Sequence, residues 1–125
     1  MSKHDFSADE FEARRSQVRA TVGQAGLDWL LVLHPVSIRW LTGSDAKSYQ
    51  EFQCLLISAK PGPIHVLTRE GERNEFQDDA LVDQLWSFGG PEPEDPIEAF
   101  ARLAGSLDLQ RACIGMEVPA FPALA

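Results

Sequence analysis

Apolar and charged residues alternate at helical spacing near the start of the chain, behind a well-marked helix start. Ser7 and Glu10 have the spacing of a capping box, which satisfies free backbone donors at the first turn of a helix. Phe6 and Phe11 hold the two positions of a hydrophobic staple. Together these signals predict a helix over about residues 8–25.

The two faces of this helix follow from its period. Apolar positions that recur every three or four residues are expected to face the core, and the charged residues between them to face solvent. The apolar set is Phe11, Val18, Val22 and Ala25, and the outward set is Glu12, Arg14, Arg15 and Arg19. Gly26 stands where a left-handed helix cap is expected.

Short apolar runs bounded by turn residues follow, and they predict strands. Residues 27–33 are almost continuously apolar, which indicates a strand covered on both faces. The other segments expected to form strands are 52–58, 64–68, 81–88 and 111–116. The turn-forming sequence at 60–63 predicts that the second and third strands form a hairpin.

Two more helical segments and two loops complete the pattern. Asp95, Pro96 and Glu98 are the cap, first-turn proline and capping-box acid of a helix that starts near residue 96. A single turn of helix is expected over 36–41, and an exposed loop with a short helix over 69–80. This order of elements predicts one α/β domain over residues 1–125, a layered fold with a mixed β-sheet flanked by helices. Residues 1–6 are expected to be a disordered tail, and 118–125 the truncated start of a following element.

Composition excludes several classes of protein. The 125 residues carry 11 basic and 19 acidic side chains, so the net charge of −8 disfavours nucleic acid as a partner. The longest apolar run, 29–33, is too short to cross a bilayer, which predicts no membrane association. The polar start of the chain lacks the apolar core of a secretory signal. A cytoplasmic protein is therefore expected.

The sequence predicts no catalytic residue and no metal site in this chain. His4, His34 and His65 have no second ligand at a spacing that would place two donors on one face, and His34 is better placed to cap the end of the first strand. Cys54 and Cys113 lie in apolar strand segments and are expected to be buried and inert.

The acidic clusters at 78–79 and 92–95 lie in polar segments, where adjacent acids usually form a solvated face. Neither a nucleophile elbow nor a glycine-rich phosphate loop occurs in the sequence.

One segment, 37–43, differs from the rest because it places Arg39 and Trp40 just before a turn, with Tyr49 a few residues later. In one interpretation Ile38 and Leu41 pack inward and the segment is an ordinary turn after a core strand. In the other, the exposed aromatics beside an arginine form a contact surface.

Five short motifs, in this order and spacing, resemble the N-terminal domain of the creatinase/prolidase family, the pita-bread metallohydrolases that include aminopeptidase P. The motifs are Phe11-Glu12, Gly26-Leu27-Asp28, Ile38-Arg39-Trp40-Leu41-Thr42-Gly43, Leu67-Thr68-Arg69 and Ile114-Gly115-Met116-Glu117. The resemblance implies a ribonuclease-H-like layered fold. It also implies that catalysis takes place in a following C-terminal domain, where two Asp, one His and two Glu bind a pair of divalent metal ions.

The same resemblance implies that this domain contributes homodimer contacts and a loop near the substrate. The substrate-proximal residues would be Arg39, Trp40, Tyr49 and Glu51. In creatinase this loop carries a phenylalanine and, two residues on, an arginine that hold the substrate carboxylate. Here Tyr49 keeps an aromatic ring, but Glu51 replaces the cation with an anion, which disfavours creatine. An Xaa-Pro dipeptide and a small amide or metabolite both stay open.

Three hypotheses for function follow. The leading one is a non-catalytic N-terminal domain that serves dimerisation and substrate access in a hydrolase. The second is a freestanding α/β binding or interaction module. A small enzyme that uses acids such as Asp78 and Asp79 ranks last.

Overall fold

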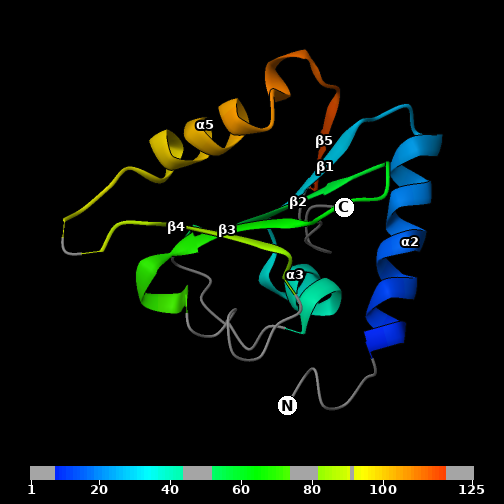
Figure 1. The fold of residues 1–125 in the computed structure, drawn as a ribbon, viewed down its shortest axis with the longest axis horizontal. Helices are drawn as coiled ribbons and strands as arrows, with labels where there is room; N and C mark the ends of the chain where they lie inside the picture. The colour runs from blue at the N-terminus through cyan, green and yellow to red at the C-terminus, as the bar shows by residue number, and fades with distance from the viewer. Residues whose placement is uncertain (1–7, 44–51, 74–81, 91, 118–125) are drawn as a thin grey trace, which may run out of the picture.

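The computed structural model describes residues 8–43, 52–73, 82–90 and 92–117. Within these residues the chain forms three α-helices, two 3₁₀ turns and five strands (Figure 1). The helices are α2 (Ala8–Gln24), α3 (Pro35–Thr42) and α5 (Pro96–Ser106), and the 3₁₀ turns are Glu70–Glu72 and Leu109–Arg111. The strands are β1 (Trp29–Val32), β2 (Cys54–Ser58), β3 (His65–Arg69), β4 (Gln84–Phe88) and β5 (Ile114–Met116).

The five strands form one mixed sheet in the order β4-β3-β2-β1-β5. Strand β2 is antiparallel to both of its neighbours, with Leu31 of β1 opposite Leu56 and Leu67 of β3 opposite Cys54. The outer pairs, β3 with β4 and β1 with β5, are parallel. Therefore β2 alone among these strands runs against the others, and the predicted hairpin is confirmed.

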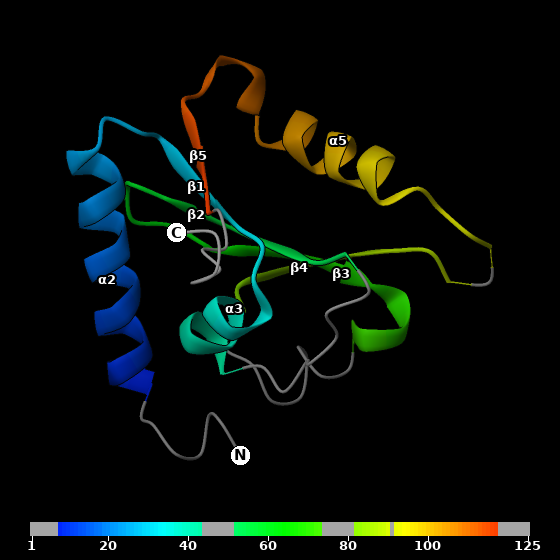
Figure 2. The same cartoon turned by 180° about the vertical axis from the view of Figure 1, so that it is seen from behind.

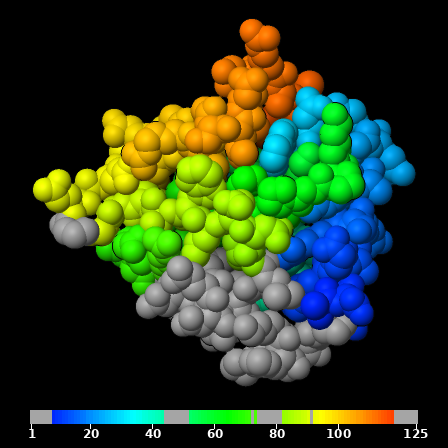
Figure 3. Space-filling view, in the orientation of Figure 1, coloured from blue at the N-terminus to red at the C-terminus, as the bar shows by residue number. Residues whose placement is uncertain are grey.

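Helices cover both faces of the sheet. Helices α2 and α3 lie on one side of it and α5 on the other (Figures 1 and 2). Helix α5 packs against β4, and the space-filling view shows their atoms side by side (Figure 3). The atoms of α2 lie at the other side of this view. The predicted layered α/β fold, a mixed sheet flanked by helices, is confirmed.

Alternation along the central strands divides the core into two apolar clusters. Leu55 and Ile57 of β2 pack with Ile38 and Leu41 on the α3 side. The α5 side receives the alternate residues of β2 together with two buried residues of the helix. These residues are Cys54, Leu56, Ala99 and Leu103. The sheet is therefore buried on both faces, as the continuous apolar run at 27–33 predicts.

The predicted strands, and the predicted helices at 8–25, 36–41 and from residue 96, correspond to the observed ones, with strand ends that differ by up to three residues. Most of the loop and short helix predicted over 69–80 lies outside the described residues. Asp95 caps α5 through a hydrogen bond from the Ile97 N–H to Oδ1 (2.9 Å), as its sequence predicts. Gly26 adopts the expected left-handed conformation (φ +76°) just after α2. The predicted tail at 1–6, the capping residues Phe6 and Ser7, and the segment 118–125 lie outside the described residues.

Candidate functional site at helix α3

Helix α3 is delimited by its own sequence. His34 is its N-cap, with Nδ1 accepting a hydrogen bond from the Val36 N–H (3.1 Å), and Pro35 occupies the first turn, where its missing donor costs nothing. At the other end Gly43 adopts φ +78° and donates to the Arg39 carbonyl (2.7 Å). The sequence predicts that His34 caps the end of the first strand; β1 instead ends at Val32, and His34 caps the start of α3.

The two faces of α3 differ sharply in burial. Ile38 and Leu41 are buried in the core, whereas Arg39 is exposed and Trp40 keeps 42% of its surface in solvent. The inward packing and the exposed Arg39-Trp40 pair, which the two interpretations treated as alternatives, therefore occur together.

Arg14 of α2 holds Trp40 in place. Its guanidinium carbon lies 4.9 Å from the centroid of the Trp40 ring and 5.1 Å from that of Phe11. Its Nη1 also donates to the Trp40 carbonyl (2.8 Å). A cation over an aromatic face is attracted by the ring quadrupole. The exposed indole of α3 is therefore held against α2 by Arg14.

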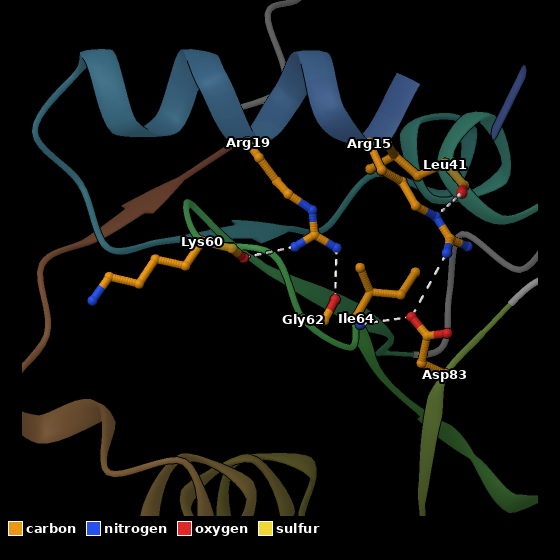
Figure 4. Close-up of polar contacts among 7 residues, drawn as sticks. All are labelled: Arg15, Arg19, Leu41, Lys60, Gly62, Ile64 and Asp83. Atoms are coloured by element: carbon orange, nitrogen blue, oxygen red, sulfur yellow. Dashed lines mark hydrogen bonds and ion pairs between the residues drawn. The ribbon is translucent and has the colours of Figure 1, made fainter. Parts of the chain in front are cut away.

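Arg15 connects α3 to the sheet (Figure 4). Its Nε donates to the Leu41 carbonyl (3.1 Å), and its Nη1 lies 3.6 Å from Oδ2 of Asp83, which accepts from the Ile64 N–H (2.9 Å). Burial lowers the pKa of Arg15, while the charge of Asp83 opposes that shift. The last turn of α3 and the start of β4 are thus joined through one side chain of α2.

Arg19 repeats this arrangement one turn later. Its two terminal nitrogens donate to the carbonyls of Lys60 (2.9 Å) and Gly62 (2.7 Å) in the β2–β3 turn (Figure 4). The prediction that Arg15 and Arg19 face solvent is wrong, since they are 6% and 9% exposed. A guanidinium has five donors in a planar fork, so backbone carbonyls can satisfy it when it is buried.

Glu117, at the end of β5, joins the same region from the opposite side. Its Oε1 accepts from the backbone N–H groups of Leu33 (3.1 Å) and His34 (2.9 Å), and its Oε2 accepts from the Ser37 hydroxyl. One carboxylate thereby satisfies donors in the β1–α3 connection. In the sequence, Glu117 is part of a family motif, but no local pattern predicts this role for it.

An apolar groove runs between α2 and α3, and we refer to it as the α2–α3 groove. One hollow of the groove, of about 310 Å³, is lined by Val18, Leu30, Val32, Val36, Ser37, Trp40, Leu41 and Glu117. A second hollow shares Val18, Leu30 and Trp40 with it and extends along α2 to Ala25 and Leu27. Arg39 does not line either hollow, so the two predicted residues of α3 serve different surfaces.

The remaining candidates divide between structural roles and undescribed positions. Glu94 pairs with Arg102 and accepts from the Gly89 N–H (3.2 Å), and the hydrogen bond from Arg102 lowers its pKa. Together with the capping role of Asp95, this makes part of the 92–95 cluster structural. The residues outside the described ranges are Tyr49, Glu51, Asp78 and Asp79.

The two cysteines lie in different environments. Cys54 is fully buried, and burial raises the pKa of its thiol to about 12, so it is unreactive near neutral pH. The prediction that Cys113 is also buried is wrong, because β5 begins only after it and its side chain is exposed.

His65 is buried on the α5 side of the sheet between two indoles. Its ring centroid lies 5.9 Å from that of Trp29 and 6.4 Å from that of Trp86, whose Nε1–H donates to His65 Nδ1 (3.3 Å). Burial lowers the pKa of His65, and the charge of Asp83 only partly opposes this. The folded protein therefore holds a neutral imidazole.

This environment predicts a pH dependence of stability. Because the unfolded chain takes up a proton at the ordinary histidine pKa of about 6.5 and the folded one only below it, the free energy of unfolding should fall as pH drops from about 7 to about 5. Urea denaturation across this range measures the slope. His65→Gln keeps an acceptor for Trp86 but cannot titrate, so its slope should be shallower. Equal slopes in the two proteins would contradict the assignment.

The described residues show neither a metal centre nor a membrane helix. Within them, no three side chains of His, Cys, Asp or Glu lie together where they could hold a metal ion. Of the helices in the same part of the chain, none combines the length and hydropathy that a bilayer crossing requires. A pair of metal ions therefore does not fit the donors that these residues bring together.

The comparisons with known proteins agree with this fold. The model of the creatinase/prolidase N-terminal domain matches residues 14–123. The chain belongs to this family. The match includes α3 and Glu117, so this region is part of the family domain.

Individual relatives are more distant. Ectoine hydrolase from Halomonas elongata is 32% identical over 59 residues, which are 47% of this chain and 15% of that protein. A Streptococcus pyogenes Xaa-Pro aminopeptidase structure has a TM-score of 0.68 at 19% identity, over 94% of this chain and 81% of that one. The dipeptidase PepE from Mycobacterium ulcerans has a TM-score of 0.60 at 23% identity, over 80% of this chain and 27% of that one. The chain thus spans only a small part of ectoine hydrolase and of PepE. At these identities the structural matches support the fold.

Proposed function

We propose that this chain is the non-catalytic N-terminal domain of a metal-dependent hydrolase of the creatinase and Xaa-Pro dipeptidase type. The observation that supports this proposal most strongly is the family match over residues 14–123. In addition, this chain covers only 27% of the dipeptidase PepE. In this proposal a C-terminal catalytic domain binds two divalent metal ions and performs the bond cleavage. The chain described here supplies the support for that domain, in a cytoplasmic homodimer.

We assign substrate access to the surface that follows α3. Arg39 is exposed beside the left-handed Gly43, and residues 44–51 follow directly. Arg14, Arg15 and Glu117 fix the position of α3 from both sides, so the residues that follow its last turn in the sequence are attached to a rigid base. Within this proposal, Arg39, Trp40, Tyr49 and Glu51 are the substrate-proximal residues.

The substrate class follows from charge. Glu51 stands where creatinase carries an arginine, and a carboxylate repels the carboxylate of creatine. Ectoine hydrolase is a curated relative, and the structural neighbours include dipeptidases and an aminopeptidase. A small amide or an Xaa-Pro dipeptide is therefore the proposed substrate.

A hydrolysis assay tests this function. The gene product that contains this chain is assayed with Mn²⁺ against ectoine, an Xaa-Pro dipeptide and creatine, alongside residues 1–125 alone. We expect turnover of one of the first two by the longer protein and no turnover by 1–125. Tyr49→Ala should raise KM about fivefold or more, as loss of a binding contact does, while Glu92→Ala, a distant exposed acid, serves as the control.

Hydrolysis by residues 1–125 alone would contradict the proposal. A gene product that ends at Ala125 and is inactive on all three substrates would instead favour a freestanding interaction module.

A further inference from the structure

A polar hollow of about 390 Å³ lies between α2 and the turn that joins β2 to β3. Its charged lining residues are Glu12, Arg15, Arg19 and Asp83, and Ser16 and the turn residues 61–63 complete its walls. Figure 4 shows Arg15 and Arg19 extending from α2 toward Asp83 and the turn. None of these described lining residues belongs to the α2–α3 groove. The hollow is therefore a separate surface, with room for a small molecule.

The two arginines of this hollow differ in their counter-ions. Arg15 has one, because its Nη1 lies 3.6 Å from Oδ2 of Asp83. Arg19 is only 9% exposed, yet no carboxylate in the described part of the chain forms an ion pair with it. A buried charge without a counter-ion is unfavourable. The hollow thus contains one uncompensated positive charge, and an anion that enters it is attracted to Arg19.

Arg19 also has hydrogen-bond donors to spare. A guanidinium carries five N–H donors, and the carbonyls of Lys60 and Gly62 accept from one on each terminal nitrogen. Among the residues that the structure describes, no acceptor takes the other three. The two carbonyl bonds hold the guanidinium in place at the turn (Figure 4). Because a carboxylate accepts two parallel bonds from such a planar fork, it is the group that matches these donors.

The acidic residues of the hollow limit the charge that it accepts. Asp83 is already paired with Arg15 and accepts from the Ile64 N–H (2.9 Å). Glu12 is exposed and precedes Arg19 by seven residues, which is about 10.5 Å along a helix axis. At physiological salt, a separation of this size is largely screened. One negative charge at Arg19 therefore balances the hollow, whereas a dianion would leave an excess beside two carboxylates.

We propose that this hollow binds the carboxylate of a small monoanion through the Arg19 guanidinium. Ser16 lies three residues before Arg19, on the same side of α2, and its exposed hydroxyl is a second donor to the ligand. The ligand class is a monocarboxylate. This inference does not depend on the proposed hydrolase activity, because it concerns binding to this chain.

Titration of the 125-residue chain with acetate tests the site, with the Arg19 Nε–H resonance as the readout. At about pH 6.5 acetate is ionised. We expect a saturable shift of this resonance with a dissociation constant on the order of 10 mM, the weak end of small-ligand affinities. Chloride at the same ionic strength should give no saturable shift. Sulfate, which is a dianion, should bind more weakly than acetate.

Two exposed positions on α2 provide matched variants. Ser16→Glu places a carboxylate three residues before Arg19, where helical side chains meet, and should weaken acetate binding about tenfold or more. Ala20→Glu adds the same charge to the same helix, but adjacent helical residues do not face each other, so its affinity should stay within about twofold. Dispersed resonances of the sheet in both variants show that the fold is retained.

Each of the following results would overturn the proposal. A shift at Arg19 that is absent, or that rises linearly with acetate, would show that no site exists. Equal affinities in Ser16→Glu and Ala20→Glu would place the anion elsewhere on the chain. Saturable binding of chloride, or binding of sulfate that is tighter than that of acetate, would contradict the carboxylate selectivity.

Discussion

Arg15→Ala should lower the free energy of unfolding by about 3 kcal/mol, because it removes a buried side chain together with its partners' contacts. The Leu41 carbonyl loses its donor and Asp83 loses its opposite charge. Arg15 is only 6% exposed, so removal of its apolar stem also leaves a cavity beneath α2. Urea denaturation at pH 7 measures the change.

Two further variants separate the contributions. Arg15→Met retains most of the stem but has no donor, so it should still lose about 2 kcal/mol. Arg111→Ala, an exposed arginine after α5, should change stability by no more than about 0.5 kcal/mol. If Arg15→Met were as stable as the parent protein, packing and not hydrogen bonding would account for the buried arginine.

Glu117→Ala should cost about 2 kcal/mol, since it leaves the N–H groups of Leu33 and His34 and the Ser37 hydroxyl without their carboxylate acceptor. The loss is local to the β1–α3 connection. Amide hydrogen exchange should therefore accelerate at Leu33 and His34 before it does in β2, in the centre of the sheet.

The conservative variant gives the sharper comparison. Glu117→Gln keeps one carbonyl oxygen for the two backbone donors, so it should lose only about 1 kcal/mol. Glu92→Ala, an exposed acid in the loop before α5, is the control and should have no measurable effect. Unchanged exchange at Leu33 and His34 in Glu117→Ala would show that the carboxylate does not stabilise this connection.

The elements that local sequence signals specify were predictable. The helix start at Asp95-Pro96 depends on short-range capping, and the structure places it where the sequence does. Helix α3 begins at Pro35, one residue before the predicted turn of helix over 36–41. The apolar run of β2 and the turn residues after it likewise specified the hairpin. These features need no information from distant residues.

The buried arginines show where pattern reasoning failed. Phe11, Arg15, Arg19 and Val22 lie four, four and three residues apart, which places them on one helical face. A reading that assigns every arginine to solvent misses this face, because the carbonyls that satisfy Arg15 and Arg19 lie 26 to 43 residues away. The spacing with Phe11 and Val22 was the signal that could have identified it.

The role of Glu117 and the exposure of Cys113 could not be predicted for a related reason. The donors to Glu117 lie 80 to 84 residues away, so no local pattern could assign its role. For Cys113 the apolar run extends beyond the strand that forms, and the residue falls in the exposed turn before it. Both outcomes depend on how β5 pairs with β1.

The central claim is that this domain positions a substrate-binding surface and that the metal-dependent chemistry takes place in another domain. Isothermal titration of the purified 125-residue chain with Mn²⁺ tests it most directly, with the longer gene product as the positive control. The account predicts two stoichiometric sites in the longer protein and only weak, non-saturating heat in the domain. Tight stoichiometric binding by the domain alone would contradict it.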